Sequence, residues 1–301
     1  MKHIFYLSLL FLFSCASNNL VEEKNIVCTT SIIYDVTKNI VPNNFRVTSL
    51  MGPGVDPHLY KSKSNDYELF KKSSTLINNG LHLEGRLTEV FEHLKKEKTV
   101  LSLSDGIAKE NLITVTVTEN VYDPHIWMDI ELMKNGIIHL SNSLQKQYPV
   151  EKLEIDSLTK NYILKLEETN HYIDSLFELI PIENKILITA HDAFSYFGKA
   201  HNIQVRSIQG ISTMSESGLR EITELIDYIA ENKIPAIFSE NSVSPKNINA
   251  VMEGCRNKGW NVKVGGELYS DALGGPSSGA DTYLQMLKGN ALTIYKGLTN
   301  N

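Results

Sequence analysis

The sequence has few cysteines, no block of like charges and no low-complexity tract. Acidic residues outnumber basic ones by 35 to 29, and the resulting net charge of −6 argues against nucleic-acid binding, which needs a basic patch. Cys28 and Cys255 are predicted to be small buried residues in different parts of the fold, not a disulfide. After the first residues, no apolar run is long enough to cross a bilayer. With 42% hydrophobic and 21% charged residues, the chain can still bury a core.

The first residues have the pattern of an export signal. Lys2 supplies a positive charge, and residues 4–13 form an apolar stretch too short to span a membrane. The letters LFSC that end at Cys15 resemble a lipobox, whose cysteine is lipidated after cleavage. We therefore expect a signal peptide with a lipobox at residues 1–15 and a polar tether at 16–24. An ordinary signal peptide cut nearby is the alternative. Either way the mature protein is exported, and it is lipid-anchored at the cell membrane or lies in the periplasm.

Strand and helix patterns alternate in two blocks. The strands are expected at 26–30, 45–51, 75–78 and 99–104, and again at 185–189, 203–208, 235–239 and 261–264. Helical patterns lie between most of them, at 32–40, 64–72, 84–95, 216–230 and 246–259, and another closes the chain at 282–298. This alternation predicts parallel sheets covered on both faces. The expected fold class is α/β, with two four-stranded (β/α)4 lobes at residues 25–148 and 182–301.

The segment between the two blocks has a different character. Residues 150–180 contain neither glycine nor proline, and their apolar residues recur at spacings near three, four and seven. This pattern predicts one long helix, ended by Pro181. A helix of that length is unusual inside a compact domain, so residues 149–181 are expected to connect the lobes. Two ordinary helices with a break near Asn170 are the alternative.

Four side chains are candidates for one metal site. The tripeptide Asp-Pro-His occurs twice and ends at His58 and at His125, while His191 and Asp271 lie in later loops. Each follows a predicted strand, and ligands of open parallel sheets bind beyond the carboxyl ends of the strands. Imidazole and carboxylate groups suit zinc and neighbouring metals, and proline holds each of the first two loops in place. On the repeated tripeptide alone, chance is an equally good explanation.

The remaining histidines are weaker candidates. His82 follows a strand and could line the cleft, whereas His201 is expected to be structural. The others with a predicted setting lie on helices as surface or packing residues, namely His93, His139 and His171.

Seven motifs occur in an order that is typical of a known family. They are GVDPH at 54–58, NGLHLE at 79–84, DPHIW at 123–127, TAHDAF at 189–194, QGIST at 209–213, FSENS at 238–242 and LYSDAL at 268–273. The chain resembles the metal-specific solute-binding proteins of ABC importers for zinc and manganese, the cluster A-I receptors. The resemblance implies two α/β lobes joined by one rigid helix, with the metal in the cleft between them. It also implies a monomer that serves an ABC permease and its ATPase subunit.

The resemblance implies the ligands residue by residue. They are the histidine of the first Asp-Pro-His (His58), the histidine before the tryptophan (His125), the first residue of His-Asp-Ala-Phe (His191) and the aspartate after Tyr-Ser (Asp271). Many zinc-specific members carry a histidine-rich loop, which residues 105–121 lack. Several manganese-specific members have glutamate at the third position, which is histidine here. Three imidazoles and one carboxylate favour Zn²⁺, with Mn²⁺ next. Because the ligating rings must be neutral, affinity is expected to fall as the pH drops through about 6.5.

Two other classes of function compete with metal capture. A secreted zinc-dependent hydrolase would use the same histidines with a metal-bound water, and Glu240 or Asp192 as general base. Asp271 as fourth ligand argues against it, because that position would have to hold the water. An adhesin or a receptor for haem or siderophores would need an apolar pocket of several hundred Å³. We therefore expect a binding protein and not an enzyme.

Overall fold

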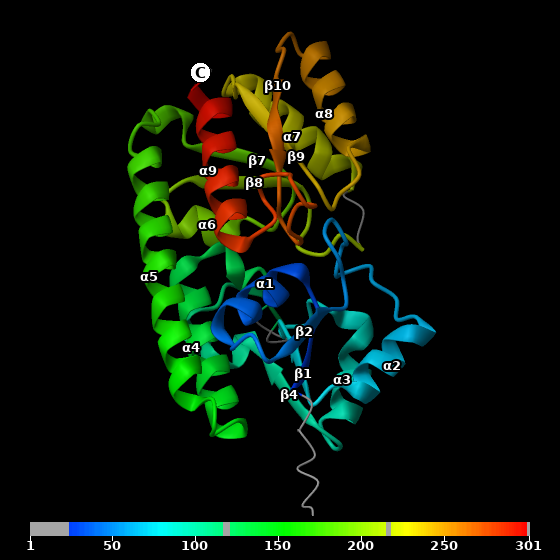
Figure 1. Ribbon diagram of the computed structural model, residues 1–301. Helices are drawn as coiled ribbons and strands as arrows, with labels where there is room; N and C mark the ends of the chain where they lie inside the picture. The colour runs from blue at the N-terminus through cyan, green and yellow to red at the C-terminus, as the bar shows by residue number, and fades with distance from the viewer. Residues whose placement is uncertain (1–23, 117–120, 215–217, 300–301) are drawn as a thin grey trace, which may run out of the picture.

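The computed structural model describes residues 24–116, 121–214 and 218–299. The chain forms two α/β lobes, one above the other in Figure 1, and helix α5 (Lys152–Phe177) runs along one side of both. The predicted signal peptide and all of the tether except Lys24 lie outside the described residues. None of the helices in the described ranges is long and apolar enough to span a bilayer.

The first lobe contains the predicted four-stranded sheet. Its strands are all parallel in the order β2-β1-β3-β4, with β1 at Asn25–Cys28, β2 at Arg46–Ser49, β3 at Thr75–Asn78 and β4 at Thr99–Ser102. β3 is buried along its whole length, as expected for a central strand covered on both faces. The helices of this lobe are α1 (Ser31–Ile40), α2 (Ser64–Lys72), α3 (Thr88–Leu94) and α4 (Ile130–Gln147).

Short elements that the sequence did not predict lie between β4 and α4. The strands β5 (Thr114–Thr116) and β6 (Val121–Tyr122) pair antiparallel as a separate two-stranded sheet. The structure also has short 3-10 turns, η1 (Gly85–Leu87), η2 (Leu103–Gly106), η3 (Lys109–Asn111), η5 (Ile126–Met128) and η6 (Ile182–Asn184). The η5 turn directly follows His125 and so helps to place that side chain.

Helix α5 is continuous over 26 residues, so the alternative of a break near Asn170 is wrong. At 1.5 Å per residue the helix is about 39 Å long. It ends at Phe177, four residues before the predicted stop at Pro181. Its buried residues recur every three or four positions, at Ile155, Thr159, Tyr162, Leu166, Thr169, Ile173 and Phe177. This stripe packs against α1 and α4 of the first lobe and against α9 (Tyr283–Thr299) of the second.

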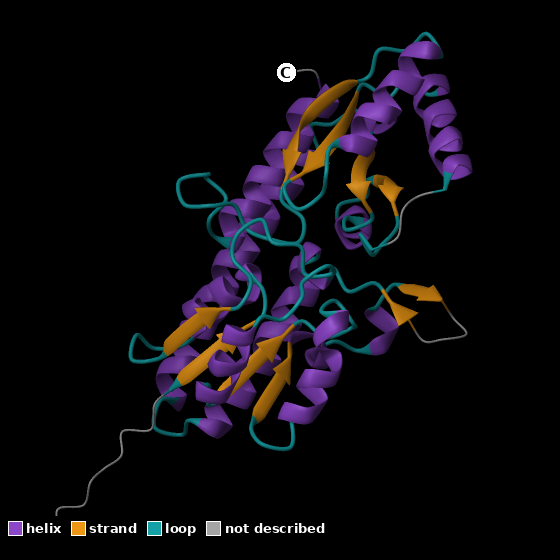
Figure 2. Cartoon of the chain, turned by 90° about the vertical axis from the view of Figure 1, so that its right-hand side faces the viewer, coloured by secondary structure: helices purple, strands orange, loops and turns teal. Residues whose placement is uncertain are grey.

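The second lobe contains the other four predicted strands. They form two parallel pairs, β7 (Ile186–His191) with β8 (Gln204–Gln209) and β9 (Ala236–Glu240) with β10 (Lys263–Leu268). β7 lies alongside β9, so the four strands make one layer although their hydrogen bonds divide it into pairs (Figure 2). The helices are α6 (Ser195–Ala200), α7 (Leu219–Glu231), α8 (Lys246–Asn257) and α9. The α/β class and the parallel strands are confirmed.

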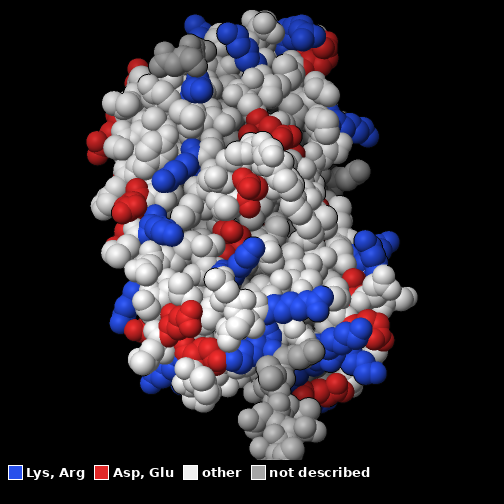
Figure 3. Space-filling view, viewed as in Figure 1, with Lys and Arg blue, Asp and Glu red and all other residues white. Residues whose placement is uncertain are grey.

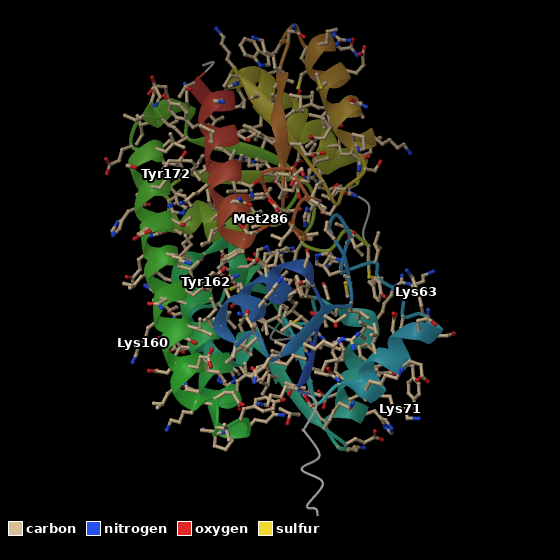
Figure 4. All side chains as sticks on the ribbon, viewed as in Figure 1. Lys63, Lys71, Lys160, Tyr162, Tyr172 and Met286 are labelled. Carbon is tan, nitrogen blue, oxygen red and sulfur yellow. The ribbon has the colours of Figure 1, made fainter. Side chains whose placement is uncertain are left out.

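The two lobes share one apolar core. The largest buried cluster contains residues of both lobes, and Tyr162 on α5 and Met286 on α9 both belong to it (Figure 4). Cys28 belongs to this cluster and Cys255 to a separate one under α7 and α8, and both thiols are free as predicted. Because the core continues from one lobe into the other, the lobes meet through packed side chains and not across an open gap.

On the face shown in Figure 3, positive and negative side chains are mixed over both lobes.

Candidate metal centre

The structure brings all four predicted ligand residues together at the boundary between the lobes. His58 follows β2, His125 precedes η5, His191 ends β7, and Asp271 follows β10. One potential ligand atom of each lies within 4.8 Å of those of the other three. His58 is 5% exposed and the other three residues are fully buried. Sequence reasoning thus found a group of side chains that are far apart along the chain and adjacent in space.

The spacing of the donor atoms suits a small cation. The Nε2 atoms of His58 and His125 are 3.3 Å apart. The two carboxylate oxygens of Asp271 lie 3.5 Å from Nε2 of His125 and 3.3 Å from Nε2 of His191. In a tetrahedral zinc site with bonds of 2.0–2.1 Å, neighbouring donors are about 3.3 Å apart. These three separations are close to the edge length of such a tetrahedron.

Two buried polar atoms of this group lack a hydrogen-bond partner among the described residues. They are Nε2 of His191 and Oδ1 of Asp271. Buried polar atoms almost always have a partner, because leaving one unsatisfied costs about 1–3 kcal/mol. Both atoms face the centre of the cluster, where a divalent cation would accept their lone pairs. The donor set therefore fits a metal ion that the protein carries.

Two buried carboxylates orient two of the imidazole rings. Nδ1 of His125 lies 2.7 Å from Oδ1 of Asp123, and Nδ1 of His191 lies 2.5 Å from Oε2 of Glu240. Each carboxylate accepts the Nδ1 proton and thereby leaves the lone pair of Nε2 directed at the centre. The same carboxylates also accept the main-chain N–H groups of their histidines, at 2.9 and 2.8 Å. Glu240 thus supports the site, a role that sequence reasoning left open beside that of a general base.

The repeated Asp-Pro-His tripeptide has a local structural basis. In the first copy, Oδ1 of Asp56 accepts the main-chain N–H of His58 at 2.8 Å. In the second copy, Asp123 accepts that of His125 in the same way. An aspartate two residues before the histidine therefore closes an Asx turn that holds the ligand. The tripeptide thus fixes its histidine twice, through the ring of the proline, as the sequence predicts, and through the carboxylate of the aspartate, which sequence reasoning missed.

The pKa values of the clustered side chains are shifted by burial and by the charges of their neighbours. Burial lowers the pKa of His58 to about 4. Burial also acts to lower the pKa of His125, but Asp123 and Asp271 outweigh it and raise this pKa to about 9. Burial opposes ionisation of Asp271 as well, yet the neighbouring histidines hold its pKa well below the usual range. The pocket is thus built to accept positive charge, supplied by protons or by a cation.

The other histidines of the described ranges lie outside this group. His82 is exposed, has a positive φ of 60°, and lines a separate pocket beside β3 and α3. The expectation that it could line the cleft is therefore wrong. Nδ1 of His201 is 2.8 Å from Asp174 on α5, which confirms its structural role. The remaining three lie on helices as predicted, His93 on α3, His139 on α4 and His171 on α5.

The fold and the site together are those of a two-lobed protein that binds a metal ion. Two α/β lobes meet at the carboxyl ends of their strands, and a buried set of three imidazoles and one carboxylate lies between them. Such a site has no place for an organic ligand and is suited to a single cation.

Comparison with known proteins identifies the family. Residues 26–297 match the model of the family described as zinc-uptake complex component A, periplasmic, and the chain belongs to this family. The manganese-binding lipoprotein MntA of Bacillus subtilis is 38% identical over 277 residues, which are 92% of this chain and 90% of that protein. The zinc-binding protein TroA of Treponema pallidum is 36% identical over 273 residues, which are 91% and 88% of the two chains.

A solved structure agrees with the sequence relatives. The periplasmic zinc-binding protein TroA from Treponema pallidum superposes with a TM-score of 0.88 at 36% identity, over 92% of this chain and 99% of that one. The resemblance that the motifs indicated is thereby confirmed. The chain is the exported, metal-binding component of a metal-uptake system of the ABC type.

Proposed function

We propose that the protein captures one divalent transition-metal ion outside the cytoplasm and delivers it to an ABC permease powered by its ATPase subunit. The ligands are His58, His125, His191 and Asp271. The observation that supports this proposal most strongly is the burial of all four side chains with their donor atoms within 4.8 Å of one another. A site completed by protein groups holds the ion without chemistry and releases it only when the ligands separate.

Zinc is the proposed cargo, with manganese as its competitor. The donor spacing suits four-coordinate Zn²⁺, and the divalent affinity order places zinc well above manganese for a site rich in imidazole. The two relatives described above are named for different metals, manganese in one case and zinc in the other. The choice of zinc therefore rests on the ligand chemistry of this chain.

The same proposal covers the organisation of the chain. Residues 25–148 and 182–301 serve as the two metal-binding lobes, and 149–181 serve as their rigid connector. This division is supported by the contacts of α5 with α1, α4 and α9. The mature protein acts as a monomer, held at the membrane through lipidated Cys15 and the tether 16–24.

We further propose that the protein is not a hydrolase. Both oxygens of Glu240 accept hydrogen bonds from His191, and Oδ1 of Asp192 accepts one from Ser195 at 2.6 Å, so both candidate bases are engaged. Residues 275–279 have the spacing Gly-x-Ser-x-Gly. They form a mainly exposed loop and not the strand-to-helix turn that a serine nucleophile requires.

Elemental analysis and competitive titration test the proposal. Protein purified without added metal is expected to contain close to one metal ion per chain, and zinc is expected to displace manganese. His191→Ala and Asp271→Ala remove one ligand each and should lose stoichiometric binding. His171→Ala, on the exposed face of α5, is the matched control and should bind as the natural chain does. Unchanged binding in both ligand variants would refute the assignment of the site.

A further inference from the structure

A pocket between the lobes borders the metal centre. It has a volume of about 320 Å³, and its lining includes Asp56 and Leu59 from the first lobe and Gln209, Thr213, Ser242 and Lys246 from the second. Lys246 is exposed and Asp56 is half-buried, and among the described residues Asp56 is the one carboxylate in the lining of this pocket.

Three lining residues adjoin three of the four ligands. Asp56 accepts the main-chain N–H of His58, and Oγ of Ser242 lies 3.4 Å from Oδ2 of Asp271. Gln209 is the β8 partner of His191 in the register of the β7–β8 pair. His58 is also the ligand that keeps some exposure, 5%, while the other three have none. The pocket therefore adjoins the metal centre.

One hydrogen bond crosses from lobe to lobe at this pocket. Oγ1 of Thr213, which follows β8, donates to Oδ2 of Asp56 at 2.6 Å. The other oxygen of Asp56 accepts the main-chain N–H groups of His58 and Leu59. The carboxylate of Asp56 thus ties the loop that carries a metal ligand to the opposite lobe.

The main-chain N–H of Gly54, in the loop that carries His58, also donates to the carbonyl of Leu273 at 3.2 Å, and further contacts between the lobes lie within the shared core. Trp127 donates through Nε1 to the carbonyl of Ser270 at 2.8 Å, and the hydroxyl of Tyr196 donates to the carbonyl of Asp123 at 2.9 Å. These residues are buried, whereas Thr213 lines a pocket open to solvent. Separation of the lobes should therefore begin at Thr213, with the packed core side as the pivot.

We propose that the cargo ion enters and leaves through this pocket, and that the Asp56–Thr213 hydrogen bond is the latch that keeps it shut. The inference rests on the proposed function, because it concerns the release of the ion held by the four ligands. The latch forms only when the lobes are together, so its loss favours opening and speeds release. Association depends on the open form and changes little.

The size of the effect follows from the type of bond. A hydrogen bond to a charged group at a buried position shifts an equilibrium about 10- to 100-fold. Because water reaches this pocket, the effect should be smaller than at a fully buried position, and Thr213→Val should release the ion about 5- to 30-fold faster. Valine has nearly the shape of threonine and removes the hydroxyl alone, so the packing around residue 213 is preserved.

Stopped-flow release of Zn²⁺ into excess chelator tests the latch. Thr213→Val should release zinc about 5- to 30-fold faster than the natural chain, with an association rate within about threefold of it. Thr213→Ser retains a hydroxyl and should release at nearly the natural rate. Thr223→Val is the matched control, because its hydroxyl bonds only to the carbonyl of Leu219 within α7. Circular dichroism of the variants shows that each is folded before its rate is compared.

Several outcomes would overturn the latch. They are a release rate of Thr213→Val within twofold of the natural rate, equal acceleration in Thr213→Ser, or equal acceleration in Thr223→Val. Failure of the proposed function looks different, because the natural chain itself would then hold no stoichiometric zinc before the chelator is added.

Discussion

Replacing Glu240 by glutamine removes one negative charge beside the metal centre and keeps the shape of the side chain. Glu240 is 3% exposed and uses its two oxygens separately. Oε2 accepts from the imidazole Nδ1 of His191 at 2.5 Å, and Oε1 accepts from its main-chain N–H at 2.8 Å. Glutamine has only one oxygen. Either the ring or the main chain of His191 must therefore face an amide NH2 group in the variant.

The expected loss is a factor of about 10–100 in zinc affinity, or about 1.4–2.7 kcal/mol, because a carboxylate partner fixes the ring and raises its basicity. Asp123→Asn provides an internal comparison. Oδ1 of Asp123 alone accepts both the ring and the main-chain N–H of His125, at 2.7 and 2.9 Å. Asparagine can keep both bonds with its single oxygen, so this variant should lose only about tenfold or less.

Competition against a chromophoric zinc chelator at fixed pH measures both affinities. Glu253→Gln, on the surface of α8, controls for the loss of one charge, because its partner Arg256 is also exposed. Glu240→Gln with the affinity of the natural chain would refute the reasoning. A larger loss in Asp123→Asn than in Glu240→Gln would refute it too, since the number of retained hydrogen bonds would then not decide the outcome.

Two further predictions concern pH and packing. Zinc affinity should rise with pH up to about 9, and not level off just above the value of about 6.5 that the sequence alone leads one to expect. The reason is that zinc must displace a proton from His125, whose pKa Asp123 and Asp271 raise to about 9 against the opposing effect of burial. A titration series from pH 6 to 10 checks this, and a plateau above pH 7 would contradict it. Gly106→Ala should lower the free energy of unfolding by about 1–3 kcal/mol, because its Cβ would lie 2.7 Å from the carbonyl oxygen of Asn135. Gly289→Ala in α9 should raise it by about 0.5–1 kcal/mol, because its Cβ would meet nothing within 4 Å. Urea unfolding of the two variants tests both signs together.

Elements with clear start and stop signals could be predicted closely from the sequence. Helix α2 and strand β3 have the predicted bounds, Ser64–Lys72 and Thr75–Asn78. Helix α5 starts two residues after the predicted start and ends three residues before the predicted end. These segments have a strong period or clear flanking residues, so local pattern decides their structure.

Other elements depend on tertiary contacts that local pattern does not contain. Strand β10 was expected to end at Val264, but it continues to Leu268 through Gly265 and Gly266. A Cβ at Gly265 would lie 2.6 Å from the ring of Phe238, and Gly266 has a φ of +145° where the register shifts. Two glycines that look like a strand end are instead needed for close packing within the strand.

The metal centre also has one part that local sequence pattern predicts and another that depends on tertiary contacts. The four proposed ligands could be found together because each lies at or after the end of a strand, and two of them also because the tripeptide Asp-Pro-His repeats. The carboxylates that orient the rings could not be assigned in the same way. Asp123 was visible beside its histidine, but Glu240 is 49 residues from His191 and meets it only because β7 lies alongside β9.

The most direct test of the metal centre is X-ray absorption at the zinc edge of the stoichiometrically loaded protein. The expected spectrum has four light donors at about 2.0–2.1 Å, with the multiple-scattering signal of three imidazoles. His58→Ala is expected to reduce that signal to two imidazoles. A first shell with six oxygens, with sulfur, or with fewer than three imidazoles in the natural chain would contradict the assignment of the four ligands.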